Sequence, residues 1–319
     1  MNSIIEAKAA DERKLHTVLL LSYERSMCMQ QRKLEELNLI DDFLFFKMLE
    51  NEVIGEEFGR YLLEIIFDRK IGKLKVIPQK VYYGSNTDKH GIRLDVYMEE
   101  ELSNDTLLRE ATIYDIEPEA DAKKSKKESI PRRVRFYHST IDVRSLGAGK
   151  DYKDLKKVIV VMIMPFDPFG YDQMIYTIQN QCLEVPELPY DDGAKTMFLY
   201  TKGTKGNPTA RLRELLHYLE DTKPENVKNE DLRAIHNLVK VVKQDAEVSR
   251  EYMKWYERDQ MIKEEGIEEG LQKGLQKGEL IGMIKTARKY GATDSEIIKN
   301  LICEYQLSEQ EAVKLINEI

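Results

Sequence analysis

The spacing of apolar residues changes period along the chain, and each change predicts a different kind of element. Residues 37–51 and 56–67 carry apolar residues at helical spacing, which predicts two helices. Residues 73–83, 91–98 and 111–117 are rich in β-branched and aromatic residues, which predicts three strands. A turn-like segment separates the first two strands, so we expect them to form a hairpin.

The next part of the chain completes an α/β pattern. Pro131 is placed like the first residue of a helix, which would end at the glycines of residues 147–149. Residues 156–166 are a nearly continuous apolar run, typical of a strand buried in the middle of a mixed sheet. Residues 176–185 and 195–203 predict two further strands.

After residue 203 the spacing is helical to the end of the chain. We therefore expect three parts: a charged helical arm (1–36), an α/β core (37–203) and an all-α region (204–319) that ends in a helix–turn–helix. Glycine recurs at every fourth position over residues 266–282. Such a repeat resembles small-xxx-small helix packing, which favours a homo-oligomer through the C-terminal helices; the alternative is a linker.

Composition narrows the class of protein. Hydrophobic residues make up 42% and charged residues 33% of the 319 positions, enough for a real core under a charged surface. The net charge of −8 gives no support to nucleic-acid binding, which would need a local basic face. Three cysteines far apart in the sequence fit a reducing cytoplasm. No apolar run reaches roughly 18 residues, so we expect no membrane span.

Acidic residues occur where apolar strands surround them. Asp95 lies in one predicted strand, Glu117 in the next, and Glu119 follows two residues later on the same face if the strand continues. Converging carboxylates repel each other unless a divalent cation lies between them, and oxygen ligands suit Mg²⁺ or Mn²⁺. The pattern therefore predicts a metal site at Asp95 and Glu117. The alternative is that these acids are solvated at the strand ends.

An Asp on one strand and Glu-x-Lys on the next is the signature of the PD-(D/E)XK nucleases. The chain most resembles their nuclease-family transposases, which are related to the recombination-promoting nucleases. The likeness covers about residues 35–205, and its segments stand in family order: 39–51, 91–100, 114–119, 130–142, 146–167 and 193–203. The resemblance implies a restriction-endonuclease-like mixed sheet flanked by helices, followed by the all-α region.

The resemblance also implies roles for single residues. Asp95 matches the metal-binding Asp, and Glu117 matches the Glu of Glu-x-Lys. Glu119 is the third catalytic position, but it stands where Lys or Gln is expected. Lysine there would orient the attacking water or stabilise developing negative charge, and glutamate cannot supply that charge. Lys124, or another lysine of the segment 123–127, would have to reach into the site instead.

In the family, a basic helix follows the acidic residues, and a basic segment stands at the same place in this chain. Arg133, Arg135 and Tyr137 match that helix, and with Lys124 they are the residues expected to bind DNA. The alternative is a solvated basic face packed by aromatic rings.

The resemblance thus implies a cytoplasmic, Mg²⁺-dependent (or Mn²⁺-dependent) DNA endonuclease linked to recombination or mobile elements. Because Glu119 departs from the motif, the alternative is a catalytically impaired member that acts as a DNA-binding or protein-interaction module.

Overall fold

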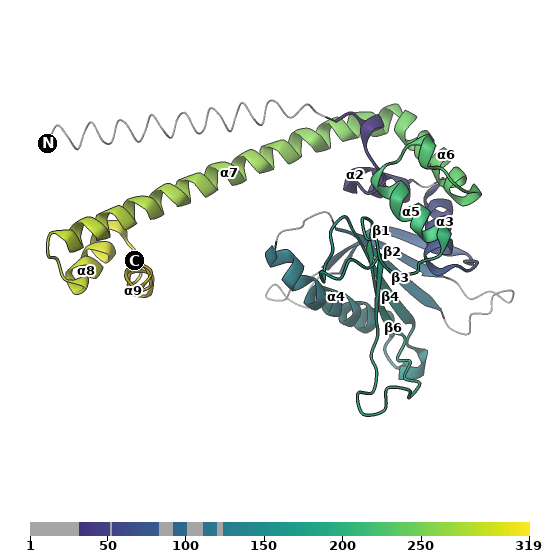
Figure 1. Ribbon diagram of the computed structural model, residues 1–319, viewed down its shortest axis with the longest axis horizontal. Coiled ribbons are helices and arrows are strands. Elements are labelled where there is room, and N and C mark those ends of the chain that lie inside the picture. The colour runs from purple at the N-terminus through teal and green to yellow at the C-terminus, as the bar shows by residue number, and fades with distance from the viewer. Residues whose placement is uncertain (1–31, 52, 83–91, 101–110, 120–123) are drawn as a thin grey trace. The chain divides into compact units, whose positions relative to one another are not determined.

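The chain forms two compact units that divide between Ser249 and Arg250. A computed structural model describes residues 32–51, 53–82, 92–100, 111–119 and 124–319 (Figure 1). Of the predicted N-terminal arm, residues 1–31 lie outside the described residues. The last residues of the arm form a short 3₁₀-helix, Leu34–Glu36, whose Leu34 is buried.

The first unit is built on a mixed sheet, which has six strands among the described residues, in the order β1-β2-β3-β4-β6-β5. The strands are β1 (Leu74–Tyr82), β2 (Ile92–Glu100), β3 (Thr112–Pro118), β4 (Lys157–Met164), β5 (Ile175–Ile178) and β6 (Ala194–Tyr200). β4 pairs in parallel with β3 and β6, and the other pairs are antiparallel. The predicted central position of the strand at 156–166 is confirmed.

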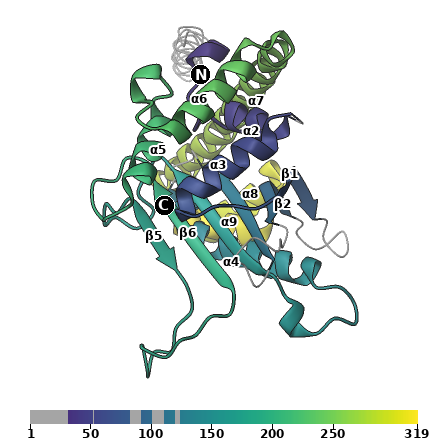
Figure 2. The ribbon, with the colours of Figure 1, turned by 90° about the vertical axis from the view of Figure 1, so that its right-hand side faces the viewer.

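Helices cover both faces of this sheet (Figure 1). α4 (Lys124–Ser145) packs on one face, against β2 and β4. α2 (Asp42–Glu50) and α3 (Gly55–Phe67) pack on the other face, and Figure 2 shows the sheet between them and α4. α5 (Ala210–Glu220) and α6 (Glu230–Gln244) pack in turn on α2 and α3. The two remaining short 3₁₀-helices are Tyr152–Asp154 and Pro224–Asn226.

Strand alternation decides which residues meet α4. Tyr97 of β2 and Ile113 of β3 share one buried cluster with Ile130, Val134 and Ile141 of α4. Because side chains alternate along a strand, the odd-numbered residues of β2 and β3 face α4. The predicted acids of these two strands are odd-numbered, so they lie beneath the same helix.

On the opposite face, a glycine permits close packing. A Cβ at Gly59 of α3 would lie 2.9 Å from Met98 Sδ of β2. A larger residue there would require the Met98 side chain to move. Met98 of β2 therefore belongs to the layer under α3.

The prediction that Pro131 opens a helix is wrong, because α4 begins at Lys124 and Pro131 lies inside it. Proline removes one helical hydrogen bond. Packing compensates: Ile130 and Val134, on either side of the proline, are buried against the sheet. β5 is also shorter than the predicted strand 176–185, since it ends at Ile178.

The first compact unit also contains α5 and α6. The segment before α2 is tied to the end of α5 by hydrogen bonds. Leu39 N donates to Thr222 Oγ1 (2.6 Å), Thr222 N donates to Asn38 Oδ1 (3.1 Å), and Ile40 N donates to Leu219 O (3.0 Å). These contacts join residues more than 170 positions apart, which periodicity alone does not reveal.

The second unit contains most of α7 (Ala246–Lys289) together with α8 (Asp294–Tyr305) and α9 (Glu309–Asn317). Its core is formed by residues from all three helices, namely Leu280, Ile284, Ile297, Leu301, Ala312 and Ile316. The glycine repeat lies inside α7, so it is helical. None of the described helices has the length and apolar character that a membrane span needs.

Candidate functional site

The structure brings Asp95 and Glu117 together. The antiparallel register pairs Val96 with Ile116, so Asp95 of β2 lies opposite Glu117 of β3. Asp95 N donates to Glu117 Oε1 at 2.8 Å. Residues opposite each other in a sheet present their side chains on the same face. The two acids that the motif predicted therefore share the sheet face covered by α4.

A third acid, Asp115, lies on the same face two residues before Glu117. Its side chain is fully buried, and neither carboxyl oxygen accepts a hydrogen bond from any described residue. Asp115 was not predicted from the sequence, where only Glu117 and Glu119 were expected to share a face. The same spacing of two in "YDIE" would have identified it.

The other buried acids of the first unit differ from Asp115 because each has hydrogen-bond donors. Glu64 accepts from Lys70 Nζ (2.8 Å) and Ile71 N (3.2 Å) at the end of α3. Glu100 accepts from Arg69 Nη2 (2.7 Å) and Gly72 N (2.8 Å). These two acids stabilise turns, whereas the group beside Asp115 is another carboxyl, that of Glu117.

Burial and mutual repulsion change the protonation of this acid group. Burial, and then the charge of Asp95, raise the pKa of Glu117 from its ordinary value of 4.5 to about 8. Burial and the neighbouring Glu117 carboxyl raise the pKa of Asp115 well above its ordinary range. At neutral pH the group therefore holds protons that solvated carboxylates would have lost.

Glu119 extends β3 and binds a cation from α4. Its backbone N donates to Ile163 O (2.9 Å), so the ladder with β4 continues past Pro118. Its Oε2 accepts from Arg133 Nη2 at 2.5 Å. Burial lowers the pKa of Arg133, but the bond to Glu119 and the charge of that carboxylate outweigh burial and raise it. The charge of Arg133 also reaches Glu117, whose pKa it lowers.

The remaining residues predicted to bind DNA have different surroundings. Tyr137, one turn after Arg133, packs against the buried cluster, and burial and the charge of Glu117 raise its pKa. Arg135 is exposed on α4. Lys124 is the first residue of α4, but its side chain lies outside the described residues. Of the four, Arg133 and Tyr137 are the ones that the described contacts bring to the acids.

The donor set suits a hard divalent cation. Asp95 and Glu117 offer only oxygen donors, and Asp115 adds two buried oxygens without donors. The described residues contain no group of three or more His, Cys, Asp or Glu side chains arranged to hold a metal ion. Asp95 and Glu117, with Asp115 two residues before Glu117 on the same strand, are the carboxyl groups that could contact an ion at this face.

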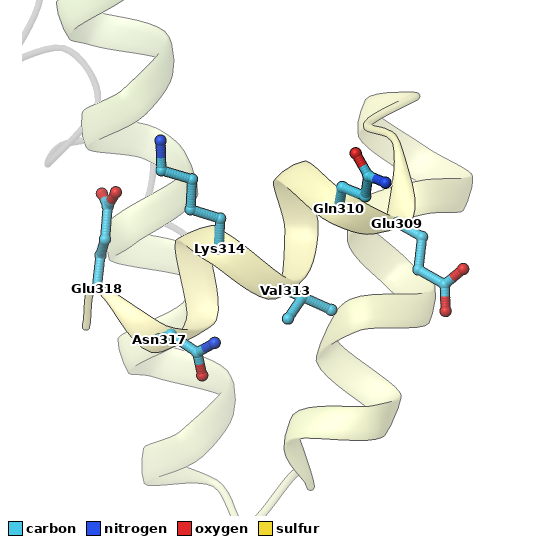
Figure 3. Close-up of a pocket in the computed structure, with 6 residues that line it drawn as sticks. All are labelled: Glu309, Gln310, Val313, Lys314, Asn317 and Glu318. Carbon is cyan, nitrogen blue, oxygen red and sulfur yellow. The ribbon is translucent and has the colours of Figure 1, made fainter.

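A hollow at α9 offers no comparable chemistry. Figure 3 shows the side chains that line it, all from the end of the chain: Glu309, Gln310, Val313, Lys314, Asn317 and Glu318. Glu318 is exposed, and its pKa is lowered by an ion pair with Lys277 at 3.1 Å. Shifts of this kind reflect surface pairing, not a buried site.

No family model, no curated protein and no solved structure matches this chain.

Proposed function

We propose that the chain is a divalent-metal-dependent DNA endonuclease of the PD-(D/E)XK transposase type, with a restriction-endonuclease-like core. The observation that supports this most is the facing of Asp95 and Glu117 across β2 and β3, with Asp95 N donating to Glu117 Oε1 at 2.8 Å. The six-stranded mixed sheet with α4 on the acidic face agrees with such a core. A link to recombination or mobile elements is part of the same proposal and depends on the sequence motifs.

Asp95 and Glu117 would hold the ion, Mg²⁺ or Mn²⁺, because they provide oxygen ligands on one face. A bound ion would supply Lewis acidity toward a phosphoryl group and would acidify the attacking water. Asp115 stands behind Glu117 and shares its electrostatic environment.

Arg133 supplies the cation that the motif normally takes from lysine. Glu119 occupies the lysine position, and it holds the guanidinium of Arg133 at 2.5 Å. A guanidinium next to Glu117 can donate to a phosphate oxygen and stabilise the charge that develops there. In this account Glu119 is a positioning residue and Arg133 is the group that contacts the phosphate.

Because the chain is acidic overall, DNA has to bind at a surface that is locally basic. α4 exposes Arg132 and Arg135 close to Arg133 in sequence, and its first residues include further lysines. Phosphate contacts by such side chains give affinity that falls steeply with salt and carries little base information. The partner we propose is therefore DNA, bound through its backbone beside the acids.

The second candidate is a catalytically impaired member that binds DNA or protein. The observation that favours it is the engagement of Arg133 by Glu119, which leaves fewer guanidinium donors for a phosphate. The two candidates differ in whether the acid pair performs chemistry.

Cleavage of supercoiled plasmid decides between them. We expect the wild-type protein to nick plasmid with Mg²⁺ or Mn²⁺, and to lose this activity in EDTA. The Asp95→Ala protein should be inactive under all conditions. DNA binding without cleavage by folded wild-type protein would support the impaired module instead, and equal cleavage by Asp95→Ala would point to a contaminating nuclease.

A further inference from the structure

A cavity of about 360 Å³ lies between α4 and the strands β5 and β6. Its apolar part is formed by Val134 of α4, Phe198 of β6 and Phe169, which precedes β5. The Phe169 and Phe198 rings are 5.1 Å apart and perpendicular, so an aromatic wall lines one side. This volume is at the lower end of the range found for small-molecule sites.

Polar groups of several kinds line this cavity. His138 of α4 interacts through Nε2 with Thr196 Oγ1 at 2.9 Å, and its Nδ1 is buried with no partner among the described residues. The amides of Gln179 and Asn180 lie at the outer part, where the chain leaves β5. Imidazole and amide groups offer both donors and acceptors. Asp142 of α4 adds a carboxyl group to the lining, and burial raises its pKa.

The cavity and the acidic site are neighbours on one sheet face. The register places Glu117, Met162 and Phe198 in one row across β3, β4 and β6, and Asp115, Val160 and Thr196 in an adjacent row. Neighbouring strands lie about 4.8 Å apart, so Glu117 and Phe198 are separated by about 10 Å. That separation is comparable with the size of one nucleotide.

α4 connects the two places. Arg133 is paired with Glu119 at the acids, and the next residue, Val134, lines the cavity. Arg135 also lines the cavity and is exposed, so a cation stands at its mouth. α4 thus places one guanidinium beside the acids and another at the mouth of the cavity.

We propose that this cavity binds a single nucleobase, taken out of the stack of the DNA strand whose phosphate lies at Asp95 and Glu117. The aromatic wall and Val134 would cover the ring, and the imidazole and amide groups would bond to its edge. This inference rests on the proposed nuclease function for its DNA ligand. It names a subsite that selects single-stranded or distorted DNA, because unstacking a base there costs least.

Binding of free nucleotides, measured without metal, tests the subsite apart from cleavage. The four deoxynucleoside 5′-monophosphates are titrated into the full chain in EDTA and followed by calorimetry. Ala194→Phe fills the cavity from β6, and Ser139→Trp blocks it from the exposed side of α4. The matched control is Val143→Phe, on the same helix at a residue that is 77% exposed.

We expect at least one nucleotide to bind the wild-type and Val143→Phe proteins with equal affinity. The same nucleotide should bind at least tenfold more weakly to each blocking variant whose melting temperature is unchanged. No binding of any of the four at millimolar concentration, or unchanged affinity in folded Ser139→Trp protein, overturns the subsite. If the subsite fails while plasmid is still nicked, the nuclease proposal stands. If nucleotides bind but no plasmid is nicked, the subsite stands and the nuclease proposal fails.

Discussion

Arg133 Nη2 donates to Glu119 Oε2 at 2.5 Å, so the residue at the motif's lysine position holds a cation from α4 beside Glu117. The sequence has glutamate at a position where lysine is expected, and in the structure this glutamate is paired with the cationic side chain of Arg133. The departure from the motif is therefore compatible with a working site, provided that Arg133 contacts the phosphate.

The role of Arg133 can be measured by substitution. Arg133→Ala should lower the single-turnover rate of Mg²⁺-dependent cleavage by about 100-fold, because a donor to developing negative charge is lost. Glu119→Lys in the Arg133→Ala background should recover part of the rate, because it returns a cation to the motif position. Arg132→Ala, an exposed neighbour on α4, is the control and should cleave at nearly the wild-type rate. If Arg133→Ala cleaves as fast as this control, the guanidinium has no part in the chemistry.

Protonation of the acids predicts how stability depends on pH. The pKa of Glu117 is raised to about 8 in the folded protein, so the folded state holds a proton that the unfolded chain loses near its ordinary value of 4.5. In EDTA the contribution of Glu117 to the free energy of unfolding should therefore be highest below pH 4.5. This contribution should fall as pH rises through 8. Glu117→Gln removes this dependence.

Urea denaturation at pH 6 and at pH 8.5 checks this expectation. Glu117→Gln should be more stable than wild type at pH 8.5, by on the order of 1 kcal/mol or more, with a smaller difference at pH 6. Glu128→Gln, an exposed acid on α4, should show the wild-type dependence. A wild-type stability that rises between the two pH values would contradict the shifted pKa.

The exposed arginines should control affinity and not rate. Arg132→Ala/Arg135→Ala should weaken binding to all DNA sequences alike, because these side chains meet phosphates and not base edges. The slope of log affinity against log salt concentration should become less steep by about 2. Fluorescence anisotropy with a catalytically inactive Asp95→Ala background gives both quantities. An unchanged slope would mean that α4 is not the DNA contact.

The glycine repeat of α7 predicts a gain in stability on substitution. A Cβ at Gly270 or Gly274 would meet no atom within 4 Å, so alanine fits both positions. Gly270→Ala/Gly274→Ala should stabilise the helix by about 1 kcal/mol per residue. Thermal unfolding followed by circular dichroism measures the gain. A loss of stability together with a smaller species in light scattering would instead reveal the proposed homo-oligomer contact through this helix.

The pattern of apolar residues predicted those features of the site that depend on neighbouring segments of the chain. Strand alternation and adjacency were enough to expect Asp95 and Glu117 on one face, because two neighbouring strands carry them. Asp115 was missed although its spacing was visible, because an isolated acid in an apolar run gives no sign of whether a donor will reach it. The contact of Glu119 with Arg133 joins residues 14 positions apart through α4, and only the packing of that helix determines it.

The predicted start of the helix at Pro131 was wrong for a related reason. Pro131 looked like a helix start because local rules disfavour proline inside a helix, but burial of Ile130 and Val134 outweighs that rule here. The packing of α5 and α6 on α2 and α3 is likewise not visible in the sequence pattern. Both are tertiary effects that no short window of sequence contains.

The joint action of Asp95 and Glu117 is the central claim, and a double-mutant cycle on cleavage tests it most directly. Single-turnover plasmid nicking with Mn²⁺ is measured for wild type, Asp95→Asn, Glu117→Gln and the double variant. If the two carboxylates hold one ion, each single substitution should lower the rate by several orders of magnitude, and the double variant should be no slower than the worse single one. Rate losses that simply multiply in the double variant, or cleavage that survives either single substitution in folded protein, would contradict the claim.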